Sequence, residues 1–205
     1  MPEALRVRDL ALDFGARTYV MGIVNMTPDS FSGDGLLAAD TPVAAAVAQA
    51  ERMVAEGADI IDVGGESTRP AGKVYGEGYS RVSVDEEAAR VVPVIERLVR
   101  ELDARVSIDT VKPAVARRAL EAGATIVNDV SCGQDVELAR VAAEHDAELV
   151  IMHNRGRGEV TEPHCAYGDL LGEVTGELRL AAEAAMAVGV ARSKIWLDPG
   201  IGFAK

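Results

Sequence analysis

The chain contains AEGADIID at residues 55–62 and a similar stretch, EAGATIVN, at residues 121–128. In each, a helical pattern ends at a glycine, and an alanine then leads into an apolar run that ends in a polar residue. Repetition of this unit predicts that helices and strands alternate. Alternation of this kind produces right-handed crossovers and a parallel sheet, so the chain is expected to have an α/β fold.

The same unit recurs along the chain and predicts six strands and five intervening helices. The strands are expected at residues 19–25, 58–63, 105–109, 124–128, 148–152 and 194–198. The helices are expected at residues 41–56, 83–102, 112–122, 135–145 and 167–189. A complete (β/α)8 TIM barrel typically needs about 250 residues. We therefore expect one domain, residues 1–205, that supplies about six βα units of such a barrel and is incomplete at its carboxyl end.

An open, doubly wound parallel sheet is the competing architecture, since six parallel strands also suit that fold. The absence of a Gly-x-Gly-x-x-Gly turn after the first strand argues weakly against it. Local signals set the helix ends. Thr41 is placed to cap the first helix, and Ser83 with Glu86 forms a capping box for the second. Pro93 is expected to kink that second helix or to mark its true beginning.

Composition narrows the class of protein. Of the 205 residues, 48% are hydrophobic, and the net charge is -12 at pH 7. A basic surface is needed to displace the counterions of nucleic acids, so the charge argues against nucleic-acid binding. Cys132 and Cys165 fit neither a metal spacing nor a disulfide framework, which is typical of a reducing compartment. No apolar run approaches the roughly 20 residues of a membrane helix, so we expect a cytoplasmic protein without membrane contact.

Three polar residues end predicted strands: Asp109, Asn128 and Asp198. The carboxyl ends of parallel strands share one edge of the sheet, so these side chains are expected around one pocket. Two carboxylates and an amide suit a flat heterocycle with amino and ring N–H groups, which is a pterin-like pattern. Acid-base hydrolysis, metal binding and simple helix capping remain alternatives for the same residues.

The loops after the first two strands supply further candidates. Asn25, at the base of a polar loop that reaches Asp34, offers a neutral oxygen suited to Mg²⁺, and Asp29 lies nearby in sequence. In the second loop, from Gly64 to about residue 81, Thr68 and Arg69 supply donors for an oxyanion such as pyrophosphate. A structural ion pair between Arg69 and Glu66 is the alternative.

Other candidates carry weaker signals. The imidazole of His153, at another strand end, is suited to donating to a ligand or acting as a base. Met152 and Phe203 are interpreted as apolar walls of the pocket.

Six stretches resemble, in the family's order, the motifs of the dihydropteroate synthases. They are MGIVNMTPDSFS at residues 21–32, GGESTRP at 64–70, SID at 107–109, IVND at 126–129, MH at 152–153, and LDPGIGFAK at 197–205. The first loop and the GGESTRP motif separate this family from other pterin-binding barrels. The resemblance therefore covers nearly the whole chain.

The resemblance implies a transferase of folate biosynthesis that is a sulfonamide target. The implied reaction joins 6-hydroxymethyl-7,8-dihydropterin diphosphate to p-aminobenzoate and releases pyrophosphate. It further implies Mg²⁺ at Asn25 and a homodimer when the chain is full length. By the family pattern, Asp109, Asn128 and Asp198 are the catalytic pterin-holding residues. Thr68, Met152 and Phe203 complete the pterin diphosphate site, and the diphosphate and p-aminobenzoate loops carry Asp29, Phe31, Thr68, Arg69 and Pro70.

The chain departs from the family pattern in two places. Ser32-Gly33-Asp34-Gly35 moves the carboxylate of the usual Ser-Asp-Gly-Gly order by one place, which leaves the role of Asp34 open. The family's lysine on the seventh strand and its arginine and histidine on the eighth have no counterpart. We therefore expect the chain alone to bind pterin weakly and to be inactive. The alternatives are a methyltetrahydrofolate-dependent methyltransferase, a pterin-binding protein without turnover, and a fragment without independent function.

Overall fold

One sheet of six parallel strands organises the molecule. The computed structural model describes residues 15–27, 41–66, 82–155, 162–203 and 205. The strands are β1 (Met21–Asn25), β2 (Ile60–Gly64), β3 (Val106–Asp109), β4 (Ile126–Asp129), β5 (Glu148–Met152) and β6 (Ile195–Asp198). They lie side by side in the order of the chain, and every neighbouring pair is parallel. The predicted strands are therefore confirmed to within two residues at each end.

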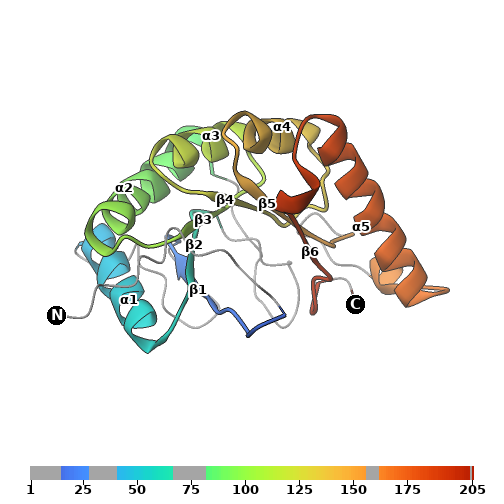
Figure 1. The fold of residues 1–205 in the computed structure, drawn as a ribbon, viewed down its shortest axis with the longest axis horizontal. Helices are drawn as coiled ribbons and strands as arrows, with labels where there is room; N and C mark the ends of the chain where they lie inside the picture. The colour runs from blue at the N-terminus through green and yellow to red at the C-terminus, as the bar shows by residue number, and fades with distance from the viewer. Residues whose placement is uncertain (1–14, 28–40, 67–81, 156–161, 204) are drawn as a thin grey trace.

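Five α-helices alternate with these strands and cover the outer side of the curved sheet (Figure 1). They are α1 (Pro42–Glu56), α2 (Val84–Leu102), α3 (Pro113–Glu121), α4 (Val136–Glu144) and α5 (Leu170–Ala187). Two short 3-10 helices, η3 (Glu162–Cys165) and η4 (Arg192–Lys194), lie before and after α5. In the parts of the chain that the structure describes, no helix is both long and apolar enough to cross a membrane.

The strand order decides between the two architectures. A doubly wound sheet reverses its strand order at a switch point and carries helices on both faces. Here the order runs from β1 to β6 without reversal, and the helices lie on one side (Figure 1). The sheet is therefore part of a (β/α)8 barrel, as expected, and the doubly wound alternative is wrong.

The helix ends follow the sequence signals in part. The Ser83 hydroxyl accepts a hydrogen bond of 3.1 Å from the Glu86 N–H, which confirms the predicted cap of α2. Thr41 is the N-cap residue of α1, but its side chain makes no capping bond. Pro93 lies inside α2, so the interpretation that the helix begins there is wrong. The acidic first turn and the Ser83 cap stabilise a start nine residues earlier.

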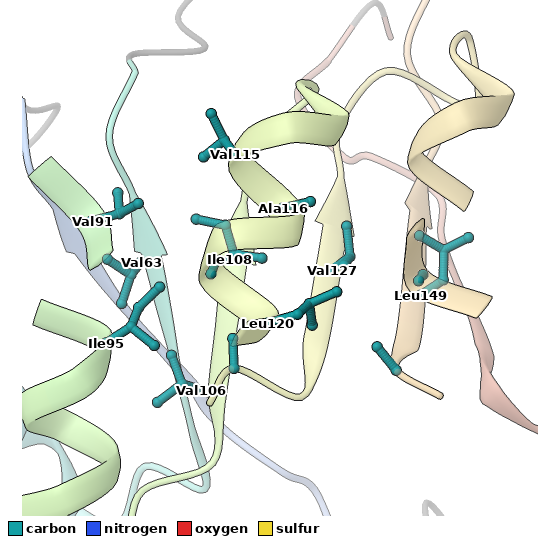
Figure 2. Packing of buried hydrophobic residues seen from close by; sticks show 14 of the residues in the cluster. Val63, Val91, Ile95, Val106, Ile108, Val115, Ala116, Leu120, Val127 and Leu149 are labelled. Atoms are coloured by element: carbon teal, nitrogen blue, oxygen red, sulfur yellow. The ribbon is translucent and has the colours of Figure 1, made fainter. Parts of the chain in front are cut away.

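The main core lies between the strands and the helices. Figure 2 shows Val91 and Ile95 of α2 beside Val63 of β2, and Leu120 of α3 beside Val127 of β4. All five side chains are buried. This layer fixes the outward-facing residues of each strand, and it leaves the other face of every strand turned toward the concave side of the sheet.

A second, smaller apolar cluster marks that concave face. It contains Ile60, Ile126 and Val150, with Met21 and Trp196 packed against them. Arg105 and Glu148 form an ion pair, and the Arg105 guanidinium lies 5.8 Å from the Trp196 ring centre. Side chains alternate along a strand, so residues two positions beyond this cluster also face the concave side, closer to the carboxyl edge.

Candidate functional site

A row of side chains crosses the carboxyl edge of the first four strands. In the register of the sheet, Asn25 lies opposite Gly64, and Gly64 lies opposite Asp109. Asp109 in turn lies opposite Asn128. A Cβ atom placed on Gly64 would lie 3.5 Å from Asp109 Oδ2 and 3.7 Å from Asn25 Oδ1. The glycine therefore leaves the space in which the amide of Asn25 and the carboxylate of Asp109 approach each other.

Asp62 adds an acidic group to this row that the sequence analysis did not identify. It lies on β2, two residues after Ile60, and is only 4% exposed. Its Oδ2 accepts a 2.9 Å hydrogen bond from Asn128 Nδ2. The signal was present in the sequence, because Asp62 is a charged residue inside a strand that is otherwise a continuous apolar run. Asp62, Asp109 and Asn128 are called the strand-end trio below.

The trio has unmet hydrogen-bonding capacity. Among the described residues, Oδ1 of Asp62 and Oδ1 of Asp109 are buried and have no hydrogen-bond partner. A buried polar atom without a partner costs stability, so its retention needs an explanation such as a ligand. Both atoms accept hydrogen bonds when ionised. The site is therefore arranged to receive a ligand that donates hydrogen bonds.

Electrostatics point the same way. Burial raises the pKa of Asp109 well above its usual value, and repulsion from the nearby Asp62 raises it further. Burial also raises the pKa of Asp62, and the hydrogen bond from Asn128 opposes the rise; the Ser107 hydroxyl on the neighbouring strand lies close enough to oppose it too, although it makes no regular hydrogen bond. Raised carboxyl pKa values are typical of functional sites. They arise where a carboxyl group is buried and the protein supplies no positive charge to stabilise its ionised form.

The remaining pocket residues lie on the next two strands. Asp198 of β6 lies opposite Met152 of β5 in the sheet register. Both follow members of the concave cluster by two residues, and Met152 is buried. Asp198 Oδ1 also accepts a 2.7 Å bond from the Gly200 N–H, which holds the turn that contains Phe203. The register thus places Asp198 and Met152 on the same edge and face as the strand-end trio.

The capping alternative fails for Asp109. Helix α3 begins at Pro113, its N-cap residue is Lys112, and no side chain caps it. Asp109 ends β3 and faces the concave side instead. A capping-type role on β4 falls to the neighbouring Asp129, whose carboxylate accepts bonds from the N–H groups of Ser131 and Gly133.

The interpretation of His153 as a ligand or base residue is wrong. Its side chain is fully buried, and Nε2 lies 3.0 Å from Glu177 Oε2 on α5. His153 follows the inward-facing Met152 directly, so it points to the opposite face of the sheet. Burial lowers the pKa of His153, and the imidazole therefore acts as a neutral partner of α5.

The base of the second loop is held by an ion network. Lys112 Nζ bonds the carboxylates of Glu66 and Glu87, and it donates to the Val82 carbonyl at 2.9 Å. Glu66 Oε2 also accepts from the Val82 N–H at 3.0 Å. Glu66 and Val82 flank residues 67–81, so this network joins the two ends of that loop. The Glu66 carboxylate, suggested above as a partner of Arg69, thus bonds Lys112 in this structure.

The loop residues named from the sequence lie outside the described residues. They are Asp29, Phe31, Asp34, Thr68, Arg69 and Pro70. Their roles stay predictions.

The oxygen atoms near Asn25 suit Mg²⁺ that is delivered with a diphosphate. Among the described residues, no three His, Cys, Asp or Glu side chains are grouped to hold a metal ion. Mg²⁺ that is delivered with a diphosphate takes most of its ligands from phosphate oxygens and water, and needs only one or two protein oxygens. The amide oxygen of Asn25, with Asp109 on the far side of Gly64, fits that requirement.

Comparisons with known proteins agree with this geometry. The family model described as "Pterin binding enzyme" matches residues 21–205. Dihydropteroate synthase of Synechocystis sp. is 45% identical over 205 residues, which are 100% of this chain and 68% of the relative. The chain therefore spans about two thirds of the length of this relative.

Solved structures give the same result. Dihydropteroate synthase of Clostridium difficile, determined in the presence of pteroic acid, is 46% identical, with a TM-score of 0.81 over 95% of this chain and 68% of that one. The Yersinia pestis enzyme in a sulfonamide drug complex is 39% identical, with a TM-score of 0.85 over 97% of this chain and 68% of that one. The strand-end pocket, the barrel topology and these matches together show that the chain belongs to the pterin binding enzyme family and is similar to the dihydropteroate synthases within it.

Proposed function

We propose that this chain carries the pterin site of a dihydropteroate synthase. The reaction would join 6-hydroxymethyl-7,8-dihydropterin diphosphate to p-aminobenzoate and release 7,8-dihydropteroate and pyrophosphate. The observation that carries the proposal is the pair of buried carboxylates, Asp62 and Asp109, whose Oδ1 atoms lack partners beside Asn128. Relatives whose structures were determined with pteroic acid and with a sulfonamide drug support the same ligand class.

The pocket matches the hydrogen-bonding edge of a pterin. A pterin has an amino group and a ring N–H that donate hydrogen bonds, together with ring nitrogens that accept them. Asp109 and Asp198 supply carboxylate acceptors, and Asn128 both donates and accepts. Met152 is buried on the same edge, where it offers an apolar wall to a flat ring.

The chemistry requires little acid-base catalysis. The bond between the methylene carbon and the diphosphate oxygen breaks, and pyrophosphate leaves with both electrons of that bond. The electron-rich pterin ring tolerates the positive charge that develops on the methylene carbon. The amine of p-aminobenzoate forms the new C–N bond and then loses a proton to solvent. Asp109, Asn128 and Asp198 fix the ring so that its methylene carbon faces the mouth of the barrel.

Mg²⁺, when bound, neutralises charge on the leaving diphosphate and so favours its departure. Asn25 would hold it, because its amide oxygen lies at the carboxyl edge beside the space left by Gly64. In the second loop, Thr68 and Arg69 are proposed to bind the diphosphate and the arylamine, with Phe31, Pro70 and Asp29 in the surrounding loops. Phe203 is proposed as part of the pterin pocket. A homodimer of the full-length protein and a cytoplasmic location also stay proposals.

Pyrophosphate release by the purified chain tests the function. The assay contains the pterin diphosphate, Mg²⁺ and p-aminobenzoate, and Asp109→Asn is the control variant. Release that requires p-aminobenzoate and disappears in the variant supports the synthase. Absence of release combined with tight pterin binding would indicate a pterin-binding protein without turnover. Release that persists in the variant would contradict the assignment of Asp109.

A further inference from the structure

Asp62 is a buried acidic residue beside the proposed pterin site, but none of the ligand contacts proposed above is assigned to it. It lies in the middle of β2, between strands on both sides, and is 4% exposed. A buried carboxylate costs stability unless hydrogen bonds and a paired charge offset its loss of hydration. Its described hydrogen bond runs to Asn128, which belongs to the pocket. The role of Asp62 is therefore to be sought in what it does to Asn128.

The bond between the two residues fixes the orientation of an amide. Oδ2 of Asp62 accepts this hydrogen bond, so the Asn128 atom that faces it is the nitrogen. The observed bond is Nδ2 to Oδ2 at 2.9 Å, with normal hydrogen-bond geometry. With one N–H held by Asp62, Asn128 has one N–H and its carbonyl oxygen left for a ligand. These two groups lie next to each other on the free edge of the amide.

We propose that Asp62 is a positioning residue that makes Asn128 present a donor beside an acceptor to the ligand, an inference that rests on the proposed pterin site. The matching ligand edge has a ring nitrogen that accepts next to an exocyclic amino group that donates. A 2-amino pterin has such an edge. A 2-oxo analogue has an acceptor where the amino group would be, so it opposes the carbonyl oxygen of Asn128. Asp62 thereby sets the preference of the pocket for 2-amino ligands.

The Asp62→Asn variant separates this role from a structural one. Asparagine has the same shape as aspartate, and it removes a buried charge that lies near Asp109. The fold is therefore expected to be kept. However, an amide at position 62 can offer either an oxygen or a nitrogen to Asn128, so the orientation of Asn128 is no longer fixed.

Ligand binding by the chain tests the inference. Titration calorimetry measures the affinity for 6-hydroxymethylpterin and for its 2-oxo analogue. We expect Asp62→Asn to lower the preference for the 2-amino ligand about tenfold. In an Asn128→Ala background, the same substitution should change the preference for the 2-amino ligand by less than about twofold, because the preference acts through Asn128. A purely structural role would weaken both ligands equally in both backgrounds, and that result would overturn the inference.

Asp129→Asn is the matched control. Asp129 is also a buried carboxylate, 2% exposed, but it bonds Ser131 and Gly133 rather than Asn128. This variant should leave the ratio of the two affinities unchanged, whatever it does to stability. A change in that ratio as large as the Asp62→Asn effect would overturn the inference.

The amide signals of Asn128 in NMR spectra give a readout without a ligand. In the wild-type chain, one of the two Nδ2 protons should exchange slowly with solvent, and Asp62→Asn should abolish that protection. Absence of protection in the wild type would overturn the inference even if the chain binds pterin. Protection in a chain that binds neither ligand would instead refute the proposed function, and with it the ligand preference assigned to Asp62.

Discussion

Two buried acidic clusters lie close together at the carboxyl edge. One contains a cation that neutralises its carboxylates, and the other does not. In the Lys112 cluster, the carboxylates of Glu66 and Glu87 share one ammonium group. The Thr110 hydroxyl donates to Glu87 at 2.6 Å, and Glu87 is only 1% exposed. In the strand-end trio, Asp62 and Asp109 have no such cation, and each has a buried oxygen without a partner among the described residues.

The difference separates a structural cluster from a binding site. The Lys112 cluster contains its own counter-charge and joins the segment after β2, helix α2 and the start of α3, so its charges are compensated within the protein in the absence of any ligand. In the trio, one carboxylate oxygen of Asp62 and one of Asp109 lack hydrogen-bond partners among the described residues. Burial also raises the pKa of Asp109. Buried charge alone therefore does not identify a ligand site. The informative feature is buried charge that the protein does not satisfy.

The largest expected effect comes from breaking the satisfied cluster. Lys112→Met leaves Glu66 and Glu87 buried without their cation, and it should lower the free energy of unfolding by about 3 kcal/mol or more. Chemical denaturation measures this change. Lys112→Arg keeps the charge and should recover most of the loss. If Lys112→Met were as stable as the wild type, the Lys112 cluster would not have the structural role assigned to it.

The next largest effect is expected from a substitution in the strand-end trio, and it concerns ligand affinity rather than stability. Asp109→Asn removes a charged acceptor from the pocket and should weaken binding of the pterin diphosphate about 30-fold or more, since hydrogen bonds to charged groups are worth about 1.5–3 kcal/mol. Titration calorimetry measures the affinity. The Lys112→Arg variant, which lies outside the pocket, serves as the control and should bind normally. An affinity equal to that of the wild type would exclude Asp109 from the site.

The smallest effect tests whether burial or pairing matters in the Lys112 cluster. Arg118 and Asp85 form an ion pair of 2.8 Å between α3 and α2, but their side chains are 47% and 85% exposed. Solvated pairs of this kind contribute little, so Arg118→Ala should lower the free energy of unfolding by less than about 0.5 kcal/mol. The same denaturation experiment applies. A loss as large as that of Lys112→Met would mean that burial is not the deciding factor.

Much of the fold could be predicted from the sequence because strands and helices have distinct periodicities. The glycine at residue 57 and the repeat at residues 121–128 set the alternation, and the strand order follows from short right-handed crossovers. Of the two alternatives for Pro93, the start of the helix was wrong because a proline signal is local, whereas the kink stays a prediction. The buried face of α2, with Val91 and Ile95 on β2, extends the helix through it.

The site was predicted less completely, for a physical reason. Asp109 ends β3, and Asn128 lies one residue before the end of β4, so their positions near strand ends were enough to predict them from the sequence. Asp62 lies two residues before the end of β2. Its hydrogen bond to Asn128 joins residues 66 positions apart in the sequence, which no local pattern reveals. His153 was misassigned because the sequence does not show which face of β5 it occupies. Its neighbour Met152 has the inward position instead.

The most direct test of this account is the pH dependence of stability in wild type and Asp109→Asn, without ligand. Because the folded-state pKa of Asp109 is raised, the folded protein holds a proton that the unfolded chain releases, and stability is lost as the pH rises through the folded pKa. The variant lacks this loss, and other titrating groups are common to both proteins. We predict curves that meet at about pH 4 or below and diverge above it, with the variant more stable near neutral pH. A variant that is less stable than the wild type at neutral pH would contradict the claim that the trio is an unsatisfied site.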